Sequence, residues 1–267
     1  MVPAGDVDLC VETFGEPTDP AVLLIAGRAS AMDWWDDEFC RRLAACGRLV
    51  VRYDHRDTGR STSFPAGAPR YSQVDLAQDA LGLLDTLQIG RAHLMGWSLG
   101  GALALRMALA RPGAVRSMTL MASTLRAPER RPDPTDWSDR RAAVDRLVSG
   151  VRANGGLFTA DEPQIRRLAE RVYDRTGSMA ASQANHWLAA GDPPAAAELG
   201  AVTAPTAVLH GTDDRVVSCV EAEELARAIP GARIVWLEGI GHEYPPAAVW
   251  RPVIEEILRV DSTKTAS

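Results

Sequence analysis

The residues best suited to chemistry surround one serine. An apolar run at Ala92–Met95 leads into Gly96-Trp97-Ser98-Leu99-Gly100, and apolar residues at helical spacing follow as far as Ala110. A strand, a sharp turn and a helix in this order predict a nucleophile elbow, a strained turn that presents the Ser98 hydroxyl above the edge of a sheet. The two glycines of the motif leave empty the space in which flanking side chains would collide with the turn. The alternative interpretation is an ordinary turn in which Ser98 caps the helix.

A serine hydroxyl needs a base to take its proton and an acid to orient that base. His242 is the candidate base, because it lies in a glycine-containing loop after the predicted strand Arg233–Leu237. The candidate acid is Asp213 or Asp214, after the predicted strand Thr206–Leu209, and physical reasoning alone does not separate these two adjacent carboxylates. Both loops follow the carboxyl ends of predicted strands, where open α/β sheets gather their ligands. The order serine, aspartate, histidine also agrees with this kind of triad.

The other four histidines have simpler interpretations. His93 lies within a predicted strand and is expected to pack in the core. His186 lies on a predicted helix, from which it could touch a substrate. His55 and His210 flank the ends of strands and are expected to make structural hydrogen bonds.

Two backbone N–H groups are the expected donors to the oxyanion that forms when serine attacks a carbonyl. The N–H of Leu99 is one, because it follows the nucleophile at the start of a helix. The other is expected after the apolar strand Ala21–Ile25, where Gly27 lets the backbone turn inward and the N–H of Arg28 is the best candidate. The Arg28 side chain is open to three interpretations: contact with an acidic substrate group, a pair with Asp33, or exposure to water.

The elements that must position these residues alternate along the chain. Strand and helix patterns follow one another, which predicts a mostly parallel sheet with right-handed crossovers and helices on both faces. An alternating pattern at Val7–Phe14 predicts one antiparallel edge strand. The other predicted strands are apolar runs at 21–25, 49–53, 92–95, 117–122, 206–209 and 233–237, and the predicted helices around them cover 34–45, 71–87, 99–110, 219–228 and 246–259.

Residues 124–203 interrupt this alternation. They are expected to form a helical lid inserted into a core of residues 1–123 and 204–267, because no strand pattern occurs in them. The expected helices are Trp137–Val151, Glu162–Arg175 with a capping box from Thr159 to Glu162, and Met179–Ala190 with Ser178 as its N-cap. Seven apolar side chains either line a substrate pocket or pack as core: Trp34, Trp35, Trp97, Trp137, Phe158, Met179 and Trp187.

The composition excludes several other classes of protein. A chain of 267 residues with 46% hydrophobic residues suits one globular α/β domain with an insertion. A formal net charge of −6 argues against nucleic acid and anionic membranes as partners. No apolar run reaches the roughly 20 residues of a membrane span, and no signal peptide is visible, so a cytoplasmic protein is expected. We expect it to be a monomer or a homodimer. The four cysteines form no C-x-x-C pair, and no metal-ligand or dinucleotide motif occurs, so neither metal nor cofactor is expected.

These motifs resemble those of the α/β-hydrolase family over nearly the whole chain. The matching pieces are Gly96–Gly100, the loop Asp54-His55-Arg56-Asp57-Thr58-Gly59-Arg60-Ser61, the segment His210–Val217 and Gly239–His242. The resemblance implies the α/β-hydrolase fold, with a mostly parallel twisted sheet of seven or eight strands, helices on both faces and an inserted helical lid. In the family pattern the acid stands three residues after a glycine, which implies Asp214.

Outside the lid the chain is most similar to the anthracycline methylesterases, of which aclacinomycin methylesterase is one. Tyr53–Ser61 and Asp37–Leu43 carry this similarity, whereas Ala26-Gly27-Arg28 departs from the His-Gly of many family members. The similarity implies a serine esterase that works through an acyl-enzyme on a small molecule, with a methyl ester of a polyketide-like compound as the implied substrate. The alternatives on this fold are a lactonase, a C–C hydrolase, a perhydrolase, a cyclisation or elimination enzyme, and a non-enzymatic ligand sensor. A dehalogenase is disfavoured, because its elbow needs aspartate in place of Ser98.

Overall fold

A seven-stranded sheet forms the centre of the molecule, of which the computed structural model describes residues 1–126, 133 and 135–262. The strand order is β3-β5-β4-β6-β7-β8-β9, and β3 pairs antiparallel with β5 while the other pairings of this sheet are parallel. The strands are β3 (Val11–Phe14), β4 (Ala21–Ile25), β5 (Leu49–Tyr53), β6 (Ala92–Trp97), β7 (Val115–Met121), β8 (Thr206–Gly211) and β9 (Arg233–Leu237). The predicted number and mostly parallel arrangement of the strands are therefore confirmed.

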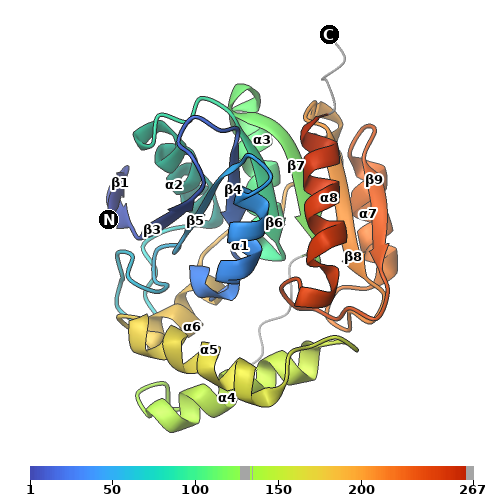
Figure 1. The fold of residues 1–267 in the computed structure, drawn as a ribbon. Coiled ribbons are helices and arrows are strands. Elements are labelled where there is room, and N and C mark those ends of the chain that lie inside the picture. The colour runs from blue at the N-terminus through green and yellow to red at the C-terminus, as the bar shows by residue number, and fades with distance from the viewer. Residues whose placement is uncertain (127–132, 134, 263–267) are drawn as a thin grey trace.

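Helices cover both faces of this sheet (Figure 1). Every residue of β4, β5, β6 and β8 is buried, as expected for apolar strands that are covered on two sides. On one face the core includes side chains of α2 (Gln73–Thr86), α3 (Leu99–Ala110) and α7 (Cys219–Ala228). On the other face it includes side chains of α1 (Asp37–Ala44) and α8 (Trp250–Asp261). The predicted α/β class, with helices on both faces, is thus confirmed.

The predicted edge strand Val7–Phe14 is wrong in its extent. The chain forms β2 (Val7–Leu9), which pairs with β1 (Val2–Ala4) in a separate two-stranded sheet, and only then β3. The division falls at Cys10, whose N–H donates to Ser61 Oγ at 2.8 Å. The Cys10 N–H is thus bonded to a side chain of the loop after β5 and not to a neighbouring strand. The alternating pattern of the sequence gives no sign of that contact.

Two predicted helices begin later than the sequence pattern suggested. The segment at 34–45 contains a 3-10 turn, η1 (Met32–Trp34), and then α1, whose N-cap is Asp36. The segment at 137–151 contains α4 (Arg140–Asn154), whose N-cap is Asp139. In both cases an aspartate accepts a backbone N–H of the first turn and fixes the start of the helix. Further 3-10 turns are η2 (Pro112–Ala114), η3 (Glu198–Ala201) and η4 (Ala247–Val249).

Three helices lie between β7 and β8 in the chain: α4, α5 (Glu162–Arg175) and α6 (Met179–Leu188). We call this segment the helical insertion; its residues 127–132 and 134 lie outside the described residues. In Figure 1 the three helices lie together beyond one end of the sheet. A small apolar cluster that includes Val144 and Ile165 joins α4 to α5, and Arg175 at the end of α5 pairs with Asp33 and Asp54 of the core at 2.6 Å each.

The caps of the insertion agree only in part with the prediction. Ser178 caps α6 as expected, because its side chain accepts the N–H of Ala181. The capping box from Thr159 to Glu162 is wrong, since the N-cap of α5 is Asp161. None of the helices in the described ranges is both long enough and apolar enough to cross a bilayer.

Candidate active site

Ser98 occupies a strained turn between β6 and α3. Its φ is 53° and its ψ is −116°, a conformation that side chains rarely adopt and that costs of order 1–3 kcal/mol. Its N–H donates to the Met121 carbonyl at 2.9 Å, which ties the turn to β7. A methyl group at Gly96 would overlap the carbonyl of Gly100, and one at Gly100 would overlap the carbonyl of Ile25. The turn therefore requires glycine on both sides of Ser98.

The structure brings Ser98, His242 and Asp214 together. His242 Nε2 lies 3.2 Å from Ser98 Oγ, and His242 Nδ1 lies 2.8 Å from Asp214 Oδ2. The side chain of Asp214 is 0% exposed and that of His242 is 8% exposed. This arrangement joins a carboxylate, an imidazole and a hydroxyl in the order that proton transfer from serine needs.

The structure also separates the two adjacent carboxylates. Asp214 Oδ1 accepts the N–H groups of Val216 and Val217, both at 2.8 Å, so Oδ2 is directed at His242. Asp213 is exposed, and its carboxylate lies 3.5 Å from the hydroxyl of Thr212. Only Asp214 is placed to orient the imidazole.

The other four histidines are buried and hydrogen-bonded. His93 bonds to Ser117 Oγ at 2.8 Å, His55 to the Ala26 carbonyl at 3.0 Å and His210 to the Val217 carbonyl at 3.0 Å, so the structural interpretations of these three are confirmed. His186 is 0% exposed, which contradicts the expected contact with substrate. Burial lowers the pKa of all four, to about 3 for His55 and to about 4 for His93 and His186.

The loop after β4 lies against the elbow. A side chain at Gly27 would overlap the ring of Trp97, and Gly27 N–H donates to Tyr244 Oη at 2.9 Å. The backbone N–H groups of Arg28 and Leu99, the two expected oxyanion donors, donate no hydrogen bond to any residue in the described part of the chain. Both donors therefore have capacity for an additional acceptor.

The Arg28 side chain contacts the helical insertion, and Arg28 also lines the cavity beside His242, so its contact with an acidic substrate group stays a prediction. It donates to the His186 carbonyl and lies over the ring of Trp187, 4.8 Å from the ring centroid. The expected pair with Asp33 is wrong, because Asp33 pairs with Arg175 at 2.6 Å. Burial lowers the pKa of Arg28.

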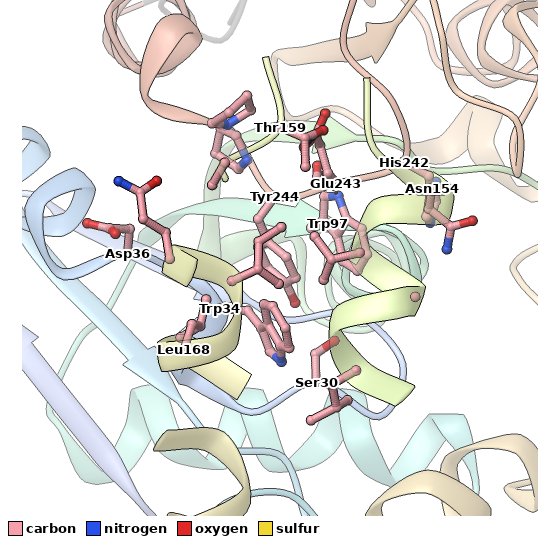
Figure 2. Close-up of a pocket in the computed structure, with 18 of the residues that line it drawn as sticks. Ser30, Trp34, Asp36, Trp97, Asn154, Thr159, Leu168, His242, Glu243 and Tyr244 are labelled. Carbon is pink, nitrogen blue, oxygen red and sulfur yellow. Dashed lines mark hydrogen bonds between the residues drawn. The ribbon is translucent and has the colours of Figure 1, made fainter. Parts of the chain in front are cut away.

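A cavity of about 910 Å³ opens beside His242 (Figure 2). Of the seven expected pocket residues, four line it: Trp34, Trp97, Trp137 and Phe158. The other three, Trp35, Met179 and Trp187, do not belong to the lining; Trp35 is 0% exposed and Met179 is 5% exposed. Two further aromatic side chains that line the cavity, Tyr244 and Trp250, were not among the expected residues.

Three of the aromatic rings that line the cavity stack on one another. Tyr244 stacks on Trp97 with ring centroids 4.2 Å apart and on Trp34 with centroids 6.4 Å apart. Trp97 also lies 4.9 Å from the His242 ring, and its indole N–H donates to the Glu243 carbonyl at 2.9 Å. Trp34, Tyr244 and Trp97 therefore form a continuous aromatic surface along the cavity, and this surface ends at His242.

Glu243 joins the histidine loop to the helical insertion. Its Oε1 accepts the N–H groups of Gly156 and Gly241 at 2.9 and 3.2 Å, and its Oε2 accepts the Thr159 hydroxyl at 2.8 Å. His242 N–H donates to the Asn154 carbonyl at 2.7 Å, also across this contact. The turn between α4 and α5 thus holds the segment that carries His242, and the Thr159 hydroxyl serves this contact while Asp161 caps α5.

We expect Glu243→Ala to lower the free energy of unfolding by about 1–3 kcal/mol, because buried donors lose their acceptor. Urea unfolding measures this change. The matched control is Glu238→Ala, at an exposed position of the same loop, for which we expect a change within about 0.5 kcal/mol. Equal losses for the two variants would contradict the role assigned to Glu243.

The chain is similar in sequence and in fold to known proteins. A profile described as an alpha/beta hydrolase fold matches residues 20–244. Rhodomycin D methylesterase from Streptomyces peucetius is 33% identical over 96% of this chain and 96% of its own. A protein from Variovorax paradoxus that is named as a candidate carbamate hydrolase is 31% identical over 94% of this chain and 96% of its own.

Solved structures show the same fold. The enol-lactonase from Burkholderia xenovorans superposes with a TM-score of 0.76 over 97% of this chain and 98% of that one. At 24% identity this likeness concerns the fold alone.

Proposed function

Because the chain belongs to the α/β-hydrolase fold family, we propose that it is a serine hydrolase that cleaves carboxylic esters through an acyl-enzyme. Ser98 is the nucleophile, His242 is the general base and Asp214 orients the base. The observation that carries the proposal is the unbroken chain of hydrogen bonds from Asp214 through His242 to Ser98, at 2.8 and 3.2 Å, beside a large aromatic cavity.

Acylation begins when Ser98 Oγ attacks the ester carbonyl carbon and His242 Nε2 takes the hydroxyl proton. Asp214 keeps the other proton on Nδ1 and stabilises the imidazolium. The oxyanion of the tetrahedral intermediate accepts the N–H groups of Leu99 and Arg28, and each such donor is typically worth about 3 kcal/mol of barrier. His242 then gives its proton to the leaving alcohol as the ester C–O bond breaks.

Deacylation repeats these steps with water. Water attacks the acyl carbonyl while His242 Nε2 takes one of its protons, and the same two N–H groups hold the new oxyanion. The bond to Ser98 Oγ breaks as His242 returns the proton to that oxygen. The products are a carboxylic acid and the free enzyme.

The proposed substrate is a methyl ester of an aromatic, polyketide-like small molecule. The cavity of about 910 Å³ lies in the range of pockets for drug-sized ligands, which is about 300–1,000 Å³. Its stacked rings suit a flat apolar ligand. The 33% identity to rhodomycin D methylesterase supports the same class of ester.

The helical insertion is proposed to act as the lid of this site, on a core of residues 1–123 and 204–267. Leu147 and Val151 of α4 and Leu168 of α5 line the cavity together with Trp34 and Tyr244. An element that covers a site in this way selects the substrates that fit beneath it. The proposed location is the cytoplasm, where the four free thiols would stay reduced.

The purified protein is expected to react covalently at Ser98 with a fluorophosphonate probe. The activated hydroxyl attacks phosphorus as it would attack a carbonyl. Mass spectrometry of the labelled peptide measures the reaction, and the heat-unfolded protein is the control. A folded protein without label at this residue would argue strongly against the proposal.

A panel of substrates then identifies the reaction. Aromatic polyketide methyl esters are expected to give the highest kcat/KM, and simple aliphatic methyl esters a lower one. Lactones, carbamates and β-diketones complete the panel. A labelled protein that turns over none of the esters would point to another reaction on the same triad.

A further inference from the structure

The loop after β4 contains a strained alanine. Ala29 has a φ of 56°, in the left-handed region that side chains avoid. It follows Arg28, whose N–H is the proposed second donor to the oxyanion. Strain of this kind persists only where the surrounding structure holds it in place.

Helix α6 of the helical insertion holds both peptide groups that flank this alanine. Ala29 N–H donates to His186 Nδ1 at 3.0 Å, and Gln183 Nε2 donates to the Ala29 carbonyl at 3.1 Å. On the other side of Arg28, the N–H of Gly27 is held at 2.9 Å by a tyrosine hydroxyl. The N–H of Arg28 therefore lies between two peptide groups that are both fixed, and they set the direction in which it points.

The imidazole of His186 is fixed in the form that this contact needs. Its Nε2 lies 2.8 Å from the Arg56 carbonyl, which can only accept, so Nε2 carries the proton and Nδ1 is free to accept. The side chain is 0% exposed. Burial lowers its pKa to about 4, although the nearby Asp57 carboxylate opposes this shift, so the ring is neutral at pH 7.

Helix α6 is itself anchored to the core next to this histidine. Asn185 is 0% exposed; its Nδ2 donates to Asp57 Oδ2 at 2.9 Å and its Oδ1 accepts the Gly67 N–H at 2.8 Å. After the helix, the Ala190 carbonyl accepts the Gln73 N–H at 2.8 Å. This part of the insertion is therefore built into the core and provides a fixed support.

We propose that helix α6 holds the oxyanion loop in its working conformation and that His186 is the positioning residue. Its Nδ1 keeps Ala29 in the left-handed conformation, and Ala29 in turn directs the Arg28 N–H toward the oxyanion. The inference rests on the proposed ester hydrolysis. His186 touches no substrate atom, so its removal acts on the transition state and leaves ground-state binding of the substrate almost unchanged.

His186→Ala is expected to lower kcat by roughly 10–100-fold and to change KM by less than about threefold. Loss of an oxyanion donor costs about 10²–10³-fold, and here the donor is misdirected and not removed. Affinity for a trifluoromethyl ketone, which forms a tetrahedral oxyanion on Ser98, should fall in parallel with kcat/KM. The control is His93→Ala, which removes an equally buried histidine that bonds to Ser117 Oγ and not to the loop after β4.

Two milder variants decide the question if His186→Ala does not fold. His186→Asn places an amide oxygen near the position of Nδ1 and can still accept the Ala29 N–H. His186→Gln places an amide N–H near the position of Nε2 and keeps only the bond to the Arg56 carbonyl. Each variant keeps one of the two hydrogen bonds, so their losses of stability should be similar, whereas kcat should be at least tenfold higher for Asn than for Gln.

Equal kcat values for the Asn and Gln variants, or an equal loss of kcat in His93→Ala, would overturn the inference. The wild-type protein is assayed beside them with the fluorophosphonate probe. If the wild type itself neither reacts with the probe nor hydrolyses esters, it is the proposed function that fails. If the wild type reacts and hydrolyses esters but the His186 variants keep its kcat, only the role assigned to α6 is refuted.

Discussion

A Ser98→Ala variant hydrolyses esters about 10⁴–10⁶-fold more slowly than the wild type, while its structure and stability stay nearly unchanged. The hydroxyl that would form the acyl-enzyme is gone, so His242 no longer has a proton to remove. KM changes little, because Ser98 Oγ contributes little to binding of the ground state. Steady-state kinetics on the best ester of the panel measure both constants.

The backbone strain at residue 98 is the same in the wild type and in Ser98→Ala, so the two proteins differ only in the hydroxyl group. Alanine at residue 98 must adopt the same positive φ of 53° as serine, so the elbow is neither relaxed nor further strained by the substitution. Thermal unfolding should therefore give closely similar midpoints for the two proteins. Turnover that survives in a folded Ser98→Ala variant would instead favour a cyclisation or elimination in which the scaffold acts without the serine.

The positions of the triad could be predicted because they depend on local patterns. Ser98 lies in a motif whose glycines are required by nearby backbone, and the loop of His242 follows a strand that the apolar pattern reveals. The choice of Asp214 over Asp213 rested on resemblance, because it depends on which carboxylate receives the N–H groups of Val216 and Val217. No property of the two aspartates themselves separates them.

The contacts that shape the rest of the site join segments far apart in the chain. The loop at Ala29 meets His186, and Glu243 meets the turn at Thr159, and neither pair shares a periodicity or a local motif. The sequence pattern therefore predicts a possible substrate contact at His186 and a helix cap at Thr159. Both residues instead use their polar atoms where the insertion meets the core, and only the tertiary structure reveals such an interface.

The second large effect on kcat is expected at Asp214, one of the two adjacent aspartates. Asp214→Asn is expected to lower kcat by about 10⁴-fold, since an amide can keep its oxygen on the N–H groups of Val216 and Val217 only by turning its NH₂ toward His242. That group donates to Nδ1 and forces the imidazole proton onto Nε2. His242 in this tautomer cannot accept the proton of Ser98.

Asp213→Asn is the matched control for this effect. It makes the same chemical change one residue away, at an exposed carboxylate that lies 3.5 Å from the Thr212 hydroxyl, so kcat should stay within about twofold of the wild type. Steady-state kinetics of the two variants, with circular dichroism to verify folding, measure the difference. An equal loss in both variants, or a larger loss in Asp213→Asn, would refute the assignment of Asp214, because the two substitutions change net charge alike and differ only in whether they reach His242.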